Sequence, residues 1–149
     1  MGYRLGTTLP PDIRSVYVPA FENRTREPQL EAEATQATIR EIQRDGTLRL
    51  ASADDADAIL TVVLTAVSEE SLRFSRDATD SAEEYRLRIE GEMSLVKRAT
   101  GERIIDSRNV QGRAVFEFIG DMTSSRQAAI PEASQDLARA IVSAFVEHW

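Results

Sequence analysis

The sequence contains no cysteine and a single histidine, His148. The absence of cysteine excludes a disulfide framework and a thiolate metal site, and it is compatible with a reducing or an oxidising compartment. With one histidine, nucleophile–histidine pairs and the common zinc-ligand spacings are excluded or nearly so. His148 precedes the last residue, a position that favours a solvated side chain over a base or a ligand.

Lysine and long apolar runs are also scarce. Lys97 is the only lysine, so the remaining basic side chains are arginines, which suit forked contacts to phosphate or carboxylate. The net charge of -7 disfavours non-specific binding of the whole molecule to nucleic acid or anionic membrane. No apolar run reaches the length of a membrane span, and the opening Gly2–Gly6 stretch is too short and polar for a signal peptide.

The sequence carries no motif for catalysis or for a cofactor. Glycines occur singly, without a phosphate-binding loop. Acidic pairs occur at 54–55, 69–70 and 83–84, in expected loops or strand ends where solvated charge is the ordinary interpretation. We therefore predict a protein that is not an enzyme and holds no cofactor or metal.

The N-terminal third predicts a leader, a strand and a helix. Residues 1–12 contain two prolines and two glycines and are expected to be an extended leader, followed by a single domain over 13–149. A β-branched and aromatic stretch predicts a strand that begins at Ile13 and ends at Pro19. The chain is then expected to turn near Asn23 and to form a helix over residues 28–45, closed by Gly46.

The rest of the chain predicts three strands and a second helix. The run 58–67 is apolar on both faces, which indicates a central strand parallel to the first, and 68–76 is expected to continue it up to a polar turn at 77–81. Strands over 83–98 and 103–119 are joined by a hairpin at Thr100-Gly101. In the first of these two strands, alternating apolar residues define one core face: Leu87, Ile89, Met93 and Leu95. After a loop at 120–125, the last helix is expected to begin near 131, or one turn earlier near 126.

These elements predict an α+β two-layer sandwich in the order βαβββα. Two helices are expected to pack on one face of a four-stranded mixed sheet that is largely antiparallel.

Four arginines form a candidate ligand site. Arg86 and Arg88 share the polar face of one strand, and Arg73 and Arg76 lie just before the preceding turn. If these strands pair as a hairpin, the arginines gather near its tip and suit phosphate groups. The alternative is that Arg86 and Arg88 pair with carboxylates such as Glu69 and Glu70 on an ordinary solvated sheet face.

Several segments, taken in order, resemble the lipopolysaccharide-assembly lipoprotein family (LptE). They are Gly2–Leu5, Val16–Thr25, Leu30-Glu31 with Thr35, Asp45-Gly46, Ala56–Leu60, Glu84–Leu87 and Thr100-Gly101. The resemblance implies an outer-membrane lipoprotein on the periplasmic face, which occupies the lumen of a large β-barrel partner and helps to deliver lipopolysaccharide to the cell surface. It also implies lipopolysaccharide binding through basic residues near the sheet, for which Arg73, Arg76, Arg86 and Arg88 are our candidates.

One position departs from the family pattern. Family members have a lipid-modified cysteine immediately before the Gly-Tyr pair, where this sequence has Met1. We interpret Met1 as the position of the expected anchor cysteine, replaced here, with the signal peptide removed. No nucleic-acid partner is expected.

Two other functions remain open from the sequence. The motif Val-Pro-x-Phe-x-Asn-x-Thr also resembles periplasmic lipoproteins that activate cell-wall synthases or serve secretion pores. A small cytoplasmic enzyme that uses loop carboxylates (Asp54, Asp55, Glu69, Glu70) is the third alternative.

Overall fold

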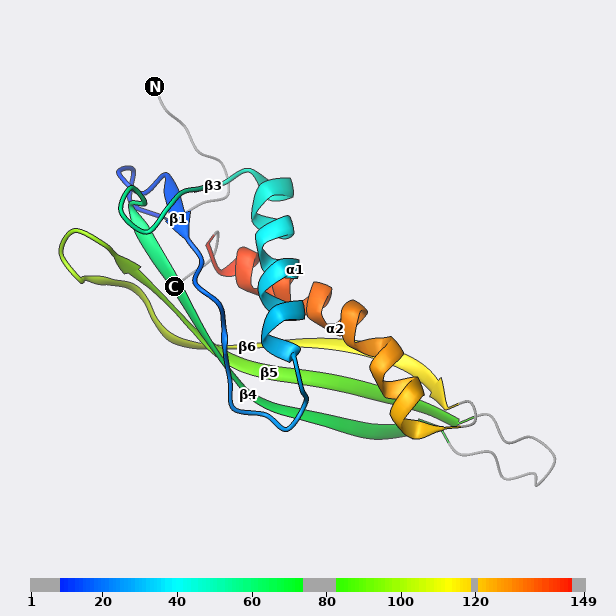
Figure 1. Cartoon of the computed structure of the whole chain (residues 1–149). Coiled ribbons are helices and arrows are strands. Elements are labelled where there is room, and N and C mark those ends of the chain that lie inside the picture. The colour runs from blue at the N-terminus through cyan, green and yellow to red at the C-terminus, as the bar shows by residue number, and fades with distance from the viewer. Residues whose placement is uncertain (1–8, 74–82, 119–120, 146–149) are drawn as a thin grey trace.

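The structure, a computed structural model, describes residues 9–73, 83–118 and 121–145. Within these ranges the chain forms six strands and two helices, of which the three longest strands make a curved ribbon with both helices on one side (Figure 1). In order, the elements are β1 (Ser15–Tyr17), β2 (Glu22–Asn23), α1 (Leu30–Asp45), β3 (Arg49–Leu50), β4 (Ala58–Arg73), β5 (Glu83–Lys97), β6 (Arg103–Phe118) and α2 (Met122–Ala144).

The sheet is mixed and largely antiparallel, as predicted, but it has six strands where four were expected. Its order is β3-β1-β4-β5-β6, and β2 pairs with β4 beyond the end of β1. The long strands β4, β5 and β6 are antiparallel, whereas β1 runs parallel to β4, which confirms the predicted βαβ unit. The two additional strands, β2 and β3, have two residues each, too short to show a hydrophobic period.

The core lies between the sheet and the two helices. The predicted core residues Leu87, Ile89, Met93 and Leu95 are all fully buried. Leu9 is also buried in this core, although it falls within the stretch expected to be leader. The α+β two-layer arrangement is thus confirmed.

The first helix begins after a polar turn. Gln29 at its N-cap is left-handed and makes no capping hydrogen bond with its side chain, and Gly46 closes the helix with a φ of 81° as the sequence predicts. The helix is tied to the segment before it by the Thr35 hydroxyl, which accepts a hydrogen bond from the Phe21 N–H at 3.0 Å in a buried position.

The second helix is longer than expected and corrects the sequence prediction. It begins at Met122 rather than near 126 or 131, so most of the expected 120–125 loop is helical. Asp121 is the N-cap: its carboxylate accepts hydrogen bonds from the Thr123 N–H and the Ser124 hydroxyl. The helix therefore starts at the Asp121 cap, and Pro131 lies inside it, less than three turns further along.

Two close contacts fix how the layers meet. At Gly112, a Cβ atom would lie 2.3 Å from the Leu137 backbone nitrogen, so α2 packs directly on the β6 backbone there. At the start of the sheet, Asp57 accepts hydrogen bonds from the Arg14 and Ser15 N–H groups at 2.9 and 3.1 Å. The hydrogen bond from Arg14 is the main cause that holds the pKa of Asp57 below its ordinary value, against the opposing effect of burial.

Candidate anion-binding site on the open face of the sheet

The face of β4, β5 and β6 that points away from the helices is called the open face here. Because Leu87 and Ile89 of β5 point into the core, Arg86 and Arg88 lie on the open face, as predicted. In the register of the sheet, Arg86 lies between Glu70 of β4 and Val115 of β6.

Arg86 is engaged by a carboxylate. Its Nη1 lies 3.2 Å from Glu70 Oε1, in an exposed pair. Such a surface pair contributes little to stability, roughly 0–1 kcal/mol. The structure therefore shows Arg86 in an ordinary cross-strand ion pair with Glu70, which is the alternative to a phosphate contact.

Arg88 is in a different position, because its cross-strand neighbours are Ser68 and Arg113. The Arg113 N–H donates to Asp136 Oδ2 of α2 at 2.8 Å and thus points away from β5. Arg88 and Arg113 therefore form a non-hydrogen-bonded pair, the kind whose side chains lie closer together. Within the described part of the chain, Arg88 Nε is buried and has no hydrogen-bond partner.

Two arginines that lie opposite one another in register, with no ion pair to a carboxylate within residues 9–73, 83–118 and 121–145, suit an anion. Like charges directly opposite one another in a sheet are destabilising, and an anion between them removes that repulsion. Guanidinium groups bind phosphate with paired, charge-assisted hydrogen bonds. The Arg88–Arg113 pair can thus hold a phosphate group.

A hollow of about 310 Å³, lined by residues of β4, β5 and β6, lies next to this pair along β5 and β6. Its polar lining consists of Thr65, Glu90, Asn109 and Gln111. Glu90 and Gln111 are cross-strand partners, and each lies two residues along its strand from Arg88 or Arg113. Carboxamide, carboxylate and hydroxyl groups suit a ligand rich in hydroxyls beside the phosphate.

The other predicted site residues are not brought into this arrangement. Arg73 is the last residue of β4, and its side chain lies outside what the structure describes. Arg76 and Met1 lie outside the described residues, as does the expected polar turn at 77–81.

Arg113 is the residue that sequence reasoning missed. If the first pair after the hairpin, Val96 with Arg103, set the register throughout, Arg88 would lie opposite Gln111. Two register shifts between Met93 and Val96 move the partner to Arg113. The alternation of polar residues in β6 could have placed Arg113 on the open face. The bulges that bring Arg113 opposite Arg88 have no clear sequence signature.

The absence of catalytic machinery remains a prediction. Three of the acidic residues that the sequence offered as catalytic candidates have separate partners in the structure. In the described ranges, no group of three histidine, aspartate or glutamate residues could hold a metal ion. Glu69 faces Arg126, Glu70 faces Arg86, and Asp55 accepts a hydrogen bond from the Ser52 hydroxyl.

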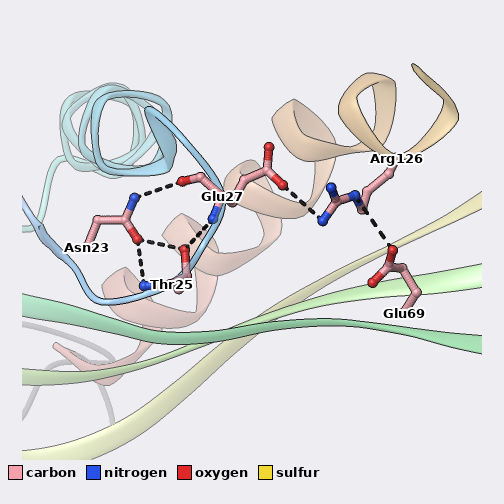
Figure 2. A network of polar contacts seen from close by, with 5 residues as sticks. All are labelled: Asn23, Thr25, Glu27, Glu69 and Arg126. Atoms are coloured by element: carbon pink, nitrogen blue, oxygen red, sulfur yellow. Dashed lines mark hydrogen bonds and ion pairs between the residues drawn. The ribbon is translucent and has the colours of Figure 1, made fainter. Parts of the chain in front are cut away.

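The turn that carries most of the sequence resemblance forms a compact polar network (Figure 2). Asn23 Oδ1 accepts hydrogen bonds from the Thr25 N–H at 2.9 Å and from the Thr25 hydroxyl at 2.6 Å. Asn23 Nδ2 donates to Glu31 Oε1 at 2.9 Å, and this hydrogen bond is the main cause that lowers the pKa of Glu31. The predicted turn at Asn23 is confirmed, and Glu31 pairs with it.

Comparison with protein families shows which family the chain belongs to. The model of the LptE family, described as lipopolysaccharide-assembly, matches residues 13–145. The chain belongs to the LptE lipopolysaccharide-assembly family. This is a family of non-catalytic outer-membrane lipoproteins that take part in lipopolysaccharide assembly. No curated protein matches the chain.

Solved structures of other bacterial proteins, two of them lipoproteins by name, share the fold. A minor lipoprotein from Acinetobacter baumannii is 9% identical, with 91% of this chain and 94% of that chain covered and a TM-score of 0.60. Lipoprotein B from Nitrosomonas europaea is 14% identical, with 99% and 94% covered and a TM-score of 0.52. A hypothetical protein from Chlamydia trachomatis is 11% identical, with 89% and 97% covered and a TM-score of 0.58. At these identities the likeness concerns the fold alone.

Proposed function

We propose that this LptE family member occupies the lumen of a large outer-membrane β-barrel, helps that barrel to assemble, and assists delivery of lipopolysaccharide to the cell surface. The observation that carries the proposal is the family match over residues 13–145, nearly the whole of the described fold. No helix in the described ranges is long and apolar enough to cross a membrane. We infer that a lipid on a cysteine at the position of Met1 attaches the native protein to the outer membrane.

We further propose that the open face binds the phosphate groups of lipopolysaccharide. Arg88 and Arg113 are the central residues, because they are direct cross-strand partners and neither forms an ion pair with a carboxylate of the part of the chain that the structure describes. Arg86 lies two residues from Arg88 on the same face, and Arg73 and Arg76 remain candidates to extend the site toward the end of the hairpin. The adjoining polar hollow is placed to receive sugar hydroxyls next to the phosphate.

The cellular role is tested by complementation of a strain depleted of its own copy. The chain is expressed behind a lipoprotein signal peptide with the substitution Met1→Cys, and surface lipopolysaccharide is measured. We expect the lipidated chain to restore surface lipopolysaccharide, whereas the same chain exported without the cysteine restores it poorly. Normal surface lipopolysaccharide in the depleted strain without any complementing chain would contradict the proposal.

The phosphate site is tested by lipopolysaccharide binding to the purified chain. We expect the double variant Arg88→Gln/Arg113→Gln to bind about tenfold more weakly, because two charge-assisted contacts are lost. Arg40→Gln, at an exposed position on α1, is the matched control and is expected to bind normally. If dephosphorylated lipopolysaccharide binds as tightly as the intact molecule, or if the control loses as much as the double variant, the site is wrong.

A further inference from the structure

The first part of α2, residues 122–130, differs from the rest of the helix in how it is attached. Among these residues only Ala129 and Ile130 are buried, both immediately before Pro131. Pro131 has no N–H, so the helical hydrogen bond to the Gln127 carbonyl is missing at that point. Residues 122–130, called the cover segment here, thus have little apolar attachment and a break in hydrogen bonding at their inner end.

One side chain joins the cover segment to two other parts of the fold. Arg126 Nη1 lies 3.1 Å from Glu27 Oε1, and Arg126 Nε lies 3.6 Å from Glu69 Oε1. Figure 2 shows the guanidinium between the two carboxylates, one from the segment before α1 and one from β4. The Arg126 side chain is 29% exposed and the Glu27 side chain only 6%. The N-cap bonds of Asp121, in contrast, are local to the cover segment and do not attach it to the sheet.

The bulge in β4 explains why Glu69 can take part. A register shift between Leu64 and Ala66 changes which residues of β4 face the helices, so that Glu69 becomes the partner of buried Leu87. Glu69 therefore lies on the helix side of the sheet, whereas its neighbour Glu70 lies on the open face with Arg86.

The polar turn holds Glu27 in place. Its backbone carbonyl accepts a hydrogen bond from Asn23 Nδ2 at 2.8 Å, and its N–H donates to Thr25 Oγ1 at 3.1 Å. Both backbone groups of Glu27 are thus fixed by the motif residues Asn23 and Thr25 (Figure 2). Because the Glu27 backbone is fixed in this way, its carboxylate is held in position to contact Arg126.

From these contacts we propose that the cover segment is a hinged lid, with Pro131 as its hinge and with the Glu27–Arg126–Glu69 bridge as the latch that keeps it closed. Figure 1 shows that the start of α2 lies over the ends of β5 and β6 away from β1. At these ends Tyr85 stacks on Phe116, with ring centroids 5.7 Å apart, and lies 6.4 Å from Phe118. Opening of the lid uncovers this aromatic surface while the rest of α2 stays on the sheet.

Hydrogen exchange of the full chain, followed by mass spectrometry, tests the lid. We expect Arg126→Gln to raise the exchange rate of the amides of residues 126–130 by about tenfold or more, while those of 134–144 are unchanged. Arg139→Gln is the matched control: it removes an exposed pair with Asp136 in the same helix, beyond the hinge, and is expected to leave 126–130 unchanged. Glu27→Gln is expected to reproduce the effect of Arg126→Gln.

A second variant tests the hinge separately from the latch. Pro131→Ala restores the missing N–H, and we expect exchange at 126–130 to become slower than in the unaltered chain. An apolar dye that fluoresces on exposed aromatic surface is expected to bind more to Arg126→Gln and less to Pro131→Ala. Faster exchange spread evenly along α2 in Arg126→Gln, or an equal effect of Arg139→Gln, would overturn the lid.

Discussion

The close approach of α2 to the β6 backbone at Gly112 offers a quantitative test of the fold. Gly112 of β6 has a backbone conformation that alanine can adopt, and alanine in a strand is otherwise favoured over glycine by roughly 0.5–1 kcal/mol. A Cβ atom there, however, would lie 2.3 Å from both the Ala133 carbonyl oxygen and the Leu137 backbone nitrogen. An ordinary contact is about 3.5 Å, so α2 would have to move by about 1 Å as a unit.

A packed helix does not make such a movement freely. Overpacking of a core costs typically 1–3 kcal/mol and occasionally more, and we expect Gly112→Ala to lie at about 3 kcal/mol because both clashing groups belong to the backbone. For a chain of this length, that loss corresponds to a fall in Tm of roughly 6–12 °C. Thermal and urea unfolding followed by far-ultraviolet circular dichroism measure it.

Gly101→Ala is the control for this substitution. Gly101 has a φ of 78° with nothing within 4 Å of the added methyl group, so only the backbone cost applies, about 1 kcal/mol. If Gly112→Ala is no less stable than Gly101→Ala, then α2 does not pack on β6 in the way described.

Three further predictions concern single polar groups. Thr35→Val leaves the buried Phe21 N–H without its acceptor and should lower the free energy of unfolding by about 2 kcal/mol in urea; an unchanged midpoint would refute the contact. Asp57, whose pKa lies below its ordinary value, stabilises the fold fully above about pH 4, and this contribution is lost as the pH falls through the lower folded-state pKa. Urea midpoints should therefore fall less steeply below pH 4 in Asp57→Asn than in the unaltered chain, and parallel curves would be evidence against this role. Asp136→Ala frees the Arg113 N–H on the edge strand and should increase self-association in light scattering, whereas a strictly monomeric variant would show that this edge needs no cover.

The long strands and their faces could be predicted because burial of one face imposes a period of two. Leu87, Ile89 and Met93 alternate with charged residues over β5, and no other regular structure places them on one side. The family resemblance was also visible in sequence, because short turn motifs such as Asn23-x-Thr25 depend on local hydrogen bonds.

What could not be predicted depends on contacts between distant segments. The strands β2 and β3 exist only through pairing with β4 and β1, and two residues carry no period. The start of α2 was missed because Pro131 resembles a first helical residue, while the Asp121 cap is equally compatible with a turn. The anion site was found only in part, since the bulges that bring Arg113 opposite Arg88 depend on the whole hairpin.

The central claim, that this family member acts inside an outer-membrane barrel, is tested most directly by affinity purification from detergent-solubilised membranes. The lipidated Met1→Cys chain carries a C-terminal tag, and its partners are identified by mass spectrometry. We predict that a large outer-membrane β-barrel of lipopolysaccharide assembly co-purifies in stoichiometric amount and that the untagged strain yields none. Recovery of a cell-wall synthase or a secretion pore without that barrel would contradict the account and favour the alternative function.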